Sequence, residues 1–289
     1  MDKLFRGRTL VIATKHGKEK IIAPLLEQHL GVKCVVPEDF DSDQFGTFTG
    51  EIERLKDPVE TARQKCEKAM AINGCDLALA SEGSFGLHPS FMFVHADSEI
   101  ILLMDKKHHL EFAVREISTH TNFNGAEIKT YDELQAFAET VMFPSHALIL
   151  RKSRQSPEDI HKGITDTVRL KKISEDLLSR HRSLFVETDM RAMHNPTRME
   201  VIEKTVHKLL HKLNSSCPRC TTPGYSLVES KSGLLCENCS SPTRSTLSHV
   251  LSCQSCGYQE EKLHPHGKAV EDPMYCDVCN PWTRWRIIV

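Results

Sequence analysis

The sequence predicts an α/β protein in three parts. These are a mixed-sheet α/β domain over residues 1–150, a helical and locally basic segment over 151–214, and a double zinc ribbon over 215–281. The first part is predicted because short β-branched runs alternate with helical apolar patterns. The third part is predicted because eight of the eleven cysteines in this chain of 289 residues form Cys-x-x-Cys pairs in its last quarter. Hydrophobic residues make up 39% of the chain, which is enough for a sizeable core.

The N-terminal part starts with an expected strand, turn and helix. Residues 9–13 are a short apolar run typical of a buried strand, and a polar turn at 14–18 leads into a helix that ends near Gly31. A second strand is expected at 33–36. The stretch 38–60 contains eight Asp or Glu and two Arg or Lys. It is predicted to be a long acidic loop, and such loops in compact domains are often functional.

Helices and strands continue to alternate through the rest of this part. Asp57-Pro58 opens a helix, since a capping side chain followed by proline is typical of a helix start. The other predicted elements are, in order, a buried strand at 77–80 that ends in Ser81-Glu82-Gly83-Ser84, a hairpin from residues 91–105 and 110–117, a helix at 131–142 and a strand at 146–150.

The following stretch is richer in basic residues. From 151 to 220 the chain has fifteen Lys or Arg and nine Asp or Glu. Helices are predicted from Pro157 to Arg180 and from Thr197 to Leu213. A basic helical surface makes nucleic acid a candidate partner, although a solvated charged face is the simpler explanation.

The start of the second of these helices is a candidate anion site. Asn195-Pro196 opens the helix, and the free N–H groups of a helix start attract anions. Arg191 and Arg198 flank it and are predicted to bind a phosphorylated substrate. An ordinary helix cap with surface arginines is the alternative.

The eight paired cysteines are predicted to be zinc ligands. They are Cys217, Cys220, Cys236, Cys239, Cys253, Cys256, Cys276 and Cys279. Two residues between ligands let one turn direct both thiolates to one ion, and four thiolates leave no position for a reacting water. Two structural zinc ions are therefore expected. Successive pairs are separated by 15, 13 and 19 residues, so the first two pairs are predicted to form one site and the last two the other, with cross-braced pairing as the alternative.

Charge and hydropathy limit the possible partners and locations. The net charge is −2, and residues 221–280 contain four bases against seven acids, so the ribbon alone is a poor nucleic-acid binder. The longest apolar run, Ile100–Met104, is far shorter than the roughly 20 residues that cross a bilayer. Residues 1–8 have no apolar signal segment. The sequence thus predicts a cytoplasmic protein without a membrane partner.

Three pieces of the N-terminal part are candidates for one catalytic site. The turn Thr14-Lys15-His16-Gly17-Lys18 could receive phosphates on backbone N–H groups and lysines. Glu60 and Lys65 follow on the next helix. Glu82 comes after a buried strand and could bind Mg²⁺ or act as a general base. For each piece alone, a solvated surface residue is the competing interpretation.

The order of these pieces resembles the inosine triphosphate pyrophosphatase-like superfamily of nucleotide hydrolases. The matching runs are Ala13-Thr14-Lys15-His16-Gly17-Lys18, Glu60-Thr61-Ala62-Arg63-Gln64-Lys65 and Leu79-Ala80-Ser81-Glu82-Gly83-Ser84-Phe85, although His16 replaces the Asn of the family. The resemblance covers about residues 9–105. It implies that Lys18 and Lys65 contact triphosphate, that Glu60 helps to hold Mg²⁺, and that Glu82 takes the place of the catalytic Asp. The implied reaction is Mg²⁺-assisted attack of water that releases pyrophosphate.

A second resemblance covers nearly the whole chain. The runs are Phe45-Gly46-Thr47-Phe48-Thr49-Gly50-Glu51, Ala80 to Gly86, Thr188-Asp189-Met190-Arg191-Ala192, Asn195-Pro196-Thr197-Arg198-Met199 and Tyr275 to Pro281. They are similar to an uncharacterised bacterial family, domain of unknown function 6671. This resemblance implies no activity, but it implies that the zinc ribbon is an integral part of the architecture.

Two functions are consistent with these features. The first is a Mg²⁺-dependent hydrolase of nucleoside triphosphates or related phosphorylated compounds, with two structural zinc ions. The second is a non-catalytic adaptor that binds nucleic acid or protein through the basic helices and the ribbons.

Overall fold

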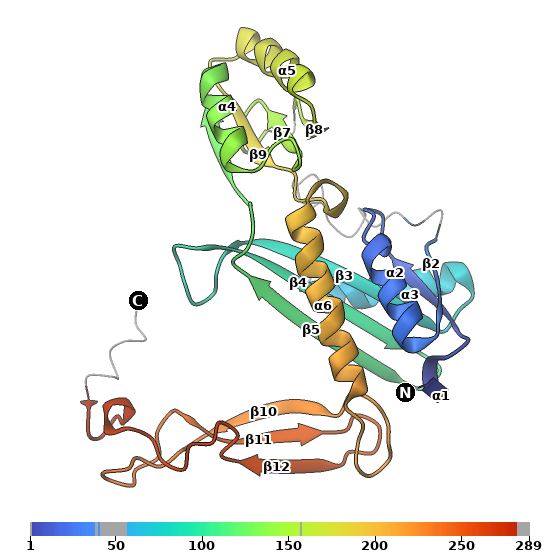
Figure 1. Cartoon of the computed structure of the whole chain (residues 1–289), viewed down its shortest axis with the longest axis vertical. Helices are drawn as coiled ribbons and strands as arrows, with labels where there is room; N and C mark the ends of the chain where they lie inside the picture. The colour runs from blue at the N-terminus through green and yellow to red at the C-terminus, as the bar shows by residue number, and fades with distance from the viewer. Residues whose placement is uncertain (1, 38–39, 41–56, 157, 282–289) are drawn as a thin grey trace. The chain divides into compact units, whose positions relative to one another are not determined.

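The computed structural model describes residues 2–37, 40, 57–156 and 158–281. The predicted acidic loop at 38–60 and the run Phe45–Glu51 therefore lie largely or wholly outside the described residues. The chain forms two compact units, one from Asp2 to Leu210 and one that begins at His211 (Figure 1).

The first unit contains a five-stranded mixed sheet, as the fold class predicted. Its strands are β1 (Thr9–Ala13), β2 (Lys33–Val35), β3 (Leu77–Leu87), β4 (His95–Asp105) and β5 (Leu110–Ser118), in the order β2-β1-β3-β4-β5. Strands β2, β1 and β3 run parallel, because helices connect them. Strands β3, β4 and β5 are antiparallel neighbours.

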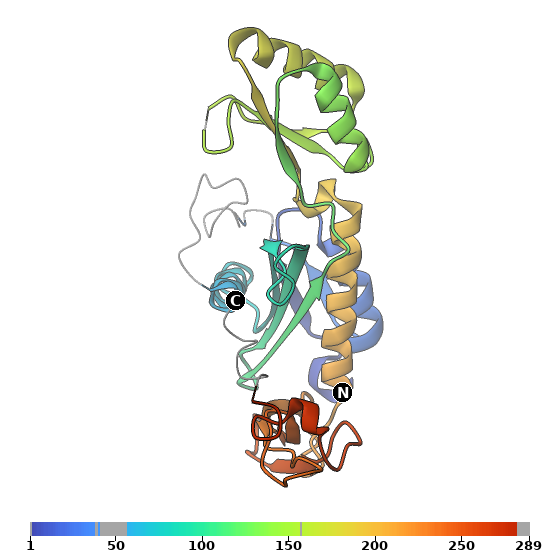
Figure 2. The same cartoon turned by 90° about the vertical axis from the view of Figure 1, so that its left-hand side faces the viewer.

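Helices cover both faces of this sheet. They are α1 (Asp2–Phe5), α2 (Glu19–Leu30), α3 (Pro58–Asn73) and α6 (Pro196–Asn214), within which the boundary between the two units falls. Helix α3 packs its Ala62, Cys66 and Ala69 against β1, β3 and β4 on one face. Helices α2 and α6 lie on the opposite face (Figure 2).

The ends of these helices follow the predicted capping chemistry. The Asp57 carboxylate accepts hydrogen bonds from the N–H groups of Val59 and Glu60 at the start of α3. Gly31 and Gly74 follow α2 and α3 with φ of 65° and 60°, the left-handed conformation that glycine adopts without strain.

Strand β3 is longer than the predicted strand at 77–80. It pairs with β4 from Leu77 opposite Asp105 to Leu87 opposite His95. Ser81-Glu82-Gly83-Ser84 therefore lies within the strand, not in a loop after it, because the antiparallel partner continues to satisfy its backbone groups. Strand β1 stops at Ala13, opposite Ala80, so β3 continues without β1 from Ser81 onward.

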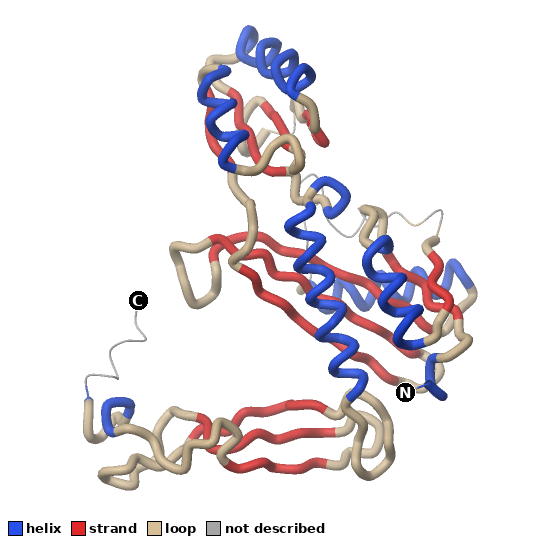
Figure 3. The backbone as a smooth tube through the Cα atoms, viewed as in Figure 1, coloured by secondary structure: helices blue, strands red, loops and turns tan. Residues whose placement is uncertain are grey.

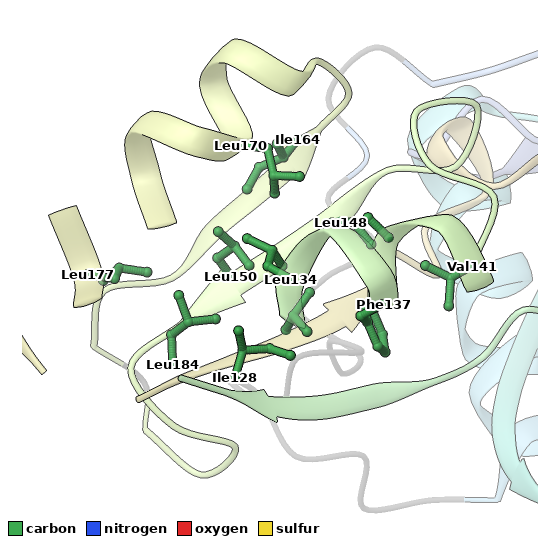
Figure 4. Packing of buried hydrophobic residues seen from close by; sticks show 12 residues of the cluster. Ile128, Leu134, Phe137, Val141, Leu148, Leu150, Ile164, Leu170, Leu177 and Leu184 are labelled. Carbon is green, nitrogen blue, oxygen red and sulfur yellow. The ribbon is translucent and has the colours of Figure 1, made fainter. Parts of the chain in front are cut away.

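A second, four-stranded sheet belongs to the same unit. Its strands are β6 (Gly125–Ile128), β7 (Leu148–Arg151), β8 (His161–Ile164) and β9 (Leu184–Thr188), all antiparallel and in the order β6-β9-β7-β8. Helices α4 (Tyr131–Thr140) and α5 (Thr167–Arg180) cover it. Their apolar residues meet in one core, in which Leu134, Leu148 and Leu184 are fully buried (Figure 4).

This sheet corrects three predictions. The segment 151–214 is not wholly helical, since it contains β8 and β9. The helix predicted from Pro157 begins instead at Thr167, where the Asp166 side chain accepts the N–H of Arg169. The helix predicted at 131–142 and the strand predicted at 146–150 belong to this second sheet, not to the first.

The second unit is built on a three-stranded antiparallel sheet. Its strands are β10 (Ser226–Ser232), β11 (Thr246–Ser252) and β12 (Gln259–Leu263), which follow one another as a meander (Figure 3). Short 3₁₀ turns occur at η2 (Ala192–His194) in the first unit and η3 (Pro273–Tyr275) in the second. No helix of the described part of the chain has the length and apolar character needed to span a membrane.

Candidate functional site

The four Cys-x-x-Cys pairs adopt the same turn, which we call a knuckle. In each knuckle the N–H of the residue after the second cysteine donates to the carbonyl of the first, at 2.8–3.0 Å. Thr221, Ser240 and Gly257 occupy that position in the first three knuckles with φ of 61°, 58° and 69°. The turn directs both thiols of a pair to one side, as a metal ion requires.

The knuckles combine into two groups of four cysteines. One group is Cys217, Cys220, Cys253 and Cys256, and the other is Cys236, Cys239, Cys276 and Cys279, with all sulfur atoms of a group within 4.8 Å of one another. The first knuckle thus combines with the third and the second with the fourth. The sequential pairing predicted from the gap lengths is wrong, and the cross-braced alternative is correct.

The sulfur spacing fits a tetrahedral ion. Sulfur atoms lie 3.7 Å apart in Cys217–Cys256 and 3.8 Å apart in Cys236–Cys279. Four thiolates about 2.3 Å from a central zinc ion would lie about 3.8 Å apart. The chain therefore has two four-cysteine centres that could each hold a metal ion, with a donor set that suits zinc.

The sheet of the second unit explains the cross-braced pairing. Strand β10 has seven residues and carries the chain roughly 23 Å away from the first knuckle before the second one forms. Strand β11 runs back beside it, with Ser252 opposite Ser226, and so returns the third knuckle to the first. Gap length alone could not reveal this, because it does not show the direction of the strands between the knuckles.

The sequence-predicted residues of the first unit gather where the strand order reverses. In the sheet, β1 lies between β2 and β3. The helices α2 and α3 cover opposite faces of this sheet (Figures 1 and 2). Ligands of open α/β sheets bind beside the carboxyl ends of strands at such a point. The turn at 14–18 follows β1 there, and from Ser81 onward β3 is paired with β4 but no longer with β1.

Lys18 lies at the centre of the candidate site at the carboxyl end of β1. It is buried, and its Nζ donates to the Oγ of Ser81 at 2.9 Å and to the carbonyl of Ser81 at 3.3 Å. Nζ also lies 4.0 Å from Glu99 Oε2. Burial, with a further contribution from Arg198, lowers the pKa of Lys18 to about 8. The ammonium is therefore largely charged at neutral pH, with little of the water that normally surrounds a lysine.

Three ionisable side chains lie on the sheet face covered by α6. Arg198 Nε donates to Glu99 Oε1 at 2.6 Å, and both side chains are fully buried. Asp97 lies two residues before Glu99 on β4, so it points to the same face. Burial and the neighbouring Glu99 raise the pKa of Asp97 to about 8. Strongly shifted groups at the carboxyl end of a sheet are candidates for a functional site.

Glu82 and Lys65 lie on the other face, which α3 covers. Lys65 Nζ is 2.5 Å from Glu82 Oε1, and both are buried. Glu60 is half-exposed in the first turn of α3, where it accepts hydrogen bonds from Arg63 and Gln64. The structure thus brings Lys65 to Glu82 as an ion pair. It places Lys18 and Glu82 on opposite faces of β3, although the charges of Glu82 and Lys65 still influence Lys18.

The rest of the predicted turn lies beside a small pocket. Thr14 is buried, Lys15 is exposed and His16 is half-buried. Thr14 and Lys15 line a pocket of about 200 Å³ together with Glu19, Val36, Pro37 and Phe40. Its position beyond the carboxyl ends of β1 and β2 matches the place where a ligand is expected.

The N-terminus of α6 is engaged by the protein itself. The N–H of Arg198 donates to Asn195 Oδ1 at 2.9 Å, and the N–H of Thr197 donates to His146 Nε2 at 3.2 Å. Arg191 forms a bidentate ion pair with Asp189. The Arg198 guanidinium also donates to the carbonyl of Met190. The geometry therefore favours a structural role for Arg198 and a capped helix over the predicted phosphate clamp.

Many basic residues of 151–220 are also paired within the first unit. The pairs include Arg151–Glu187, Lys152–Glu158, Lys171–Glu175, Arg180–Asp159, Arg191–Asp189, Arg198–Glu99 and Lys208–Glu116. Some of these acids, such as Glu99 and Glu116, come from outside the segment. They neutralise part of the positive charge that the sequence of residues 151–220 alone suggests.

Sequence reasoning did not single out Asp97 and Glu99. Both lie in the stretch 91–105, which the sequence predicts to be one strand of a hairpin. The available signal was the acidic pair Asp97-x-Glu99 just before the apolar run Ile100–Leu103, since two acids on one face of a buried strand need a partner.

Comparison with known proteins identifies a family and no activity. A family model described as a domain of unknown function (DUF6671) matches residues 65–281. This range includes Lys65, Glu82 and all eight cysteines of the two centres, and it begins after the turn at 14–18 and after Glu60. No curated protein matches the chain.

Proposed function

We propose that this chain, which belongs to the DUF6671 family, is a Mg²⁺-dependent hydrolase of nucleoside triphosphates or related phosphorylated compounds. The observation that carries the proposal is the buried Lys18 ammonium at the carboxyl end of β1, where the strand order reverses. Anionic ligands bind at such points, next to helix N-termini. The buried charges around Lys18 support a catalytic site over a simple surface cluster.

In this proposal the chain's own residues have separate roles. Lys18 binds phosphate oxygens, and its low hydration makes that contact strong. Lys65 is the second phosphate ligand from the opposite face of β3, and Glu82 holds it in place. Glu82 is also the candidate general base for the attacking water. Thr14, Lys15 and His16 bind the substrate from the turn.

The proposed Mg²⁺ needs carboxylate ligands whose oxygen atoms can reach it. When bound, Mg²⁺ would neutralise phosphate charge and activate water. The sequence-predicted ligands are Glu60 and Glu82, but Arg63 and Gln64 engage Glu60, and Lys65 engages Glu82. These two side chains therefore fit Mg²⁺ only if their ion pairs open when substrate binds.

We assign the four-cysteine centres a structural role. Each centre has four thiolates, so a bound zinc ion has no open position for a substrate or water. The sheet of the second unit has few fully buried apolar residues, and metal binding supplies the stability that such a module lacks.

Turnover assays test the proposed activity. The zinc-loaded protein is incubated with Mg²⁺ and a panel of ordinary and altered nucleoside triphosphates, and pyrophosphate or phosphate release is measured. We expect release for at least one substrate and a loss of roughly a hundredfold in Glu82→Gln, the usual cost of removing a general base. Circular dichroism confirms that the variant is folded.

A panel without turnover above the Glu82→Gln background would contradict the proposal. The adaptor function would then become the better explanation. In that case binding to RNA or DNA should weaken steeply with salt if the basic residues contact phosphates.

A further inference from the structure

The pocket beside the turn at 14–18 is too small for a whole nucleotide. It has a volume of about 200 Å³, and Val36, Pro37 and Phe40 form its apolar wall. Pockets that enclose a whole drug-sized ligand have volumes of about 300–1,000 Å³. This pocket therefore suits one part of a substrate, such as a single ring system.

Thr14 presents a polar group to this pocket. The residue is 6% exposed, and its hydroxyl forms no hydrogen bond with a described residue. A buried hydroxyl without a partner costs folding free energy. Because Thr14 lines the pocket, a ligand placed there can supply the missing hydrogen bond.

Glu19 adds an acid to the lining of the same pocket. It is half-buried in the first turn of α2, and its carboxylate forms no ion pair with a described residue. An ionised carboxylate accepts hydrogen bonds from N–H and O–H groups but repels phosphate. Lys15 also lines the pocket and offsets the charge of Glu19. A neutral group with N–H donors therefore fits this pocket better than a phosphate does.

The pocket lies close enough to Lys18 to share one substrate with it. The lining residues follow β1 and β2, whereas Lys18 contacts Ser81 of β3, on the other side of β1. Neighbouring strands are about 5 Å apart, so the pocket and the Lys18 ammonium are roughly 5–10 Å apart along the sheet edge. The ribose of a nucleotide connects its base and its phosphates over such a distance.

We infer that this pocket binds the nucleobase of the substrate. The ring lies against the apolar wall, its N–H groups face Thr14 and Glu19, and the phosphates extend to Lys18. This inference rests on the proposed function and deepens it, because it narrows the substrate from phosphorylated compounds in general to nucleotides.

The test compares nucleotides with inorganic triphosphate, which has the phosphates and no base. The full-length, zinc-loaded protein is titrated calorimetrically with inorganic triphosphate and with non-hydrolysable triphosphates of the common nucleosides, all in the presence of Mg²⁺. We expect at least one nucleotide to bind about tenfold more tightly than inorganic triphosphate.

Val36→Trp fills the pocket from a position that is 38% exposed. It should remove the advantage of the nucleotide and leave the binding of inorganic triphosphate unchanged. Ile72→Trp, at an exposed position of α3, is the matched control and should change neither affinity. Circular dichroism confirms that both variants are folded.

Glu19→Gln separates recognition of the base from repulsion of phosphate. If Glu19 accepts hydrogen bonds from the base, the variant should bind the nucleotide about tenfold more weakly and inorganic triphosphate equally well or better. Glu67→Gln, at an exposed acid of α3, should change neither affinity. Tighter binding of both ligands by Glu19→Gln would show that Glu19 only repels phosphate, which contradicts its assigned role.

Two results would overturn the inference and leave the proposed phosphate site intact. One is equal affinity of the wild type for the nucleotides and for inorganic triphosphate. The other is a nucleotide advantage that survives in Val36→Trp. Binding of neither ligand would contradict both the inference and the proposed function. Nucleotide binding that behaves as expected without any turnover would support the base pocket and contradict the hydrolase activity alone.

Discussion

Gly83 of β3 leaves room for the fully buried ion pair between Arg198 and Glu99, which lies directly over it. A Cβ atom at this position would lie 2.3 Å from the Nη2 of Arg198 and 2.4 Å from the Oε1 of Glu99. Gly83 lies directly opposite Glu99 in the sheet, so its missing side chain leaves the space that the pair occupies. A glycine in a strand interior is otherwise unfavourable.

Gly83→Ala should therefore lower the free energy of unfolding by about 3 kcal/mol, because it disrupts a buried ion pair. Gly86→Ala on the same strand is the matched control, since its Cβ would meet nothing within 4 Å. Its effect should stay below about 1 kcal/mol. Urea unfolding followed by circular dichroism measures both. Equal effects at the two positions would refute the packing argument.

His146 is predicted to make the stability of the first unit depend on pH. Its Nε2 accepts the N–H of Thr197 at the start of α6, and burial lowers the pKa of its imidazole. A lowered folded-state pKa means that the stabilisation is present above the unfolded pKa of about 6.5 and is lost as pH falls below it.

Between pH 7 and pH 5.5 the wild type should lose up to about 1.4 kcal/mol per pH unit from this residue. His146→Gln, whose amide does not titrate, should lose less over the same range. Urea unfolding at several pH values compares the two slopes. Parallel slopes would show that His146 stays neutral, or equally charged, in both states.

At the level of elements, the antiparallel meander of β10, β11 and β12 determines which knuckles combine into one centre. Replacing the four cysteines of the first and third knuckles by serine should remove one centre and leave one zinc per chain. Replacing those of the first and second knuckles should damage both centres and leave none. Zinc analysis of the purified variants distinguishes the two patterns, and reversed counts would restore the sequential pairing.

Local signals predicted the elements better than they predicted how far the elements extend. The cap at Asp57 and the glycines at 31 and 74 mark real helix ends, because capping depends on neighbouring residues. Strand β3 runs past its predicted end at Ala80 because β4, a distant partner, pairs with it. The knuckles were predicted from spacing, whereas their pairing depends on strand direction.

At the level of the whole molecule, the chain divides into two compact units, and the boundary falls within α6. The first has two sheets with apolar cores, and we propose that the second depends on metal ions at its cysteine centres. Chelation of zinc should therefore unfold the second unit and leave the first intact. Limited proteolysis with mass spectrometry should show new cleavage sites only after residue 210. New cleavage within β1 to β5 would show that the first unit also depends on zinc.

The candidate site was predictable only in part, for a physical reason. The turn at 14–18 and the acid at 82 were visible in the sequence, because strand ends and helix starts have local patterns. Sequence could not show that Lys18 and Glu82 approach β3 from different sides, or that Asp97 and Glu99 join Lys18. Those relations come from the register of β3 and β4 and from the distant arginine on α6.

The most direct test of the central claim is binding of a non-hydrolysable nucleoside triphosphate analogue at Lys18. Calorimetric titration in the presence of Mg²⁺ compares the wild type with Lys18→Met and with Lys20→Met, which replaces an exposed lysine in the first turn of α2. Loss of a charge-assisted contact should weaken binding about tenfold or more in Lys18→Met and leave Lys20→Met unchanged. Wild-type binding should also weaken as pH rises through about 8, where Lys18 loses its proton. Absence of binding, or equal binding by Lys18→Met, would contradict the claim that this point of the sheet is a phosphate site.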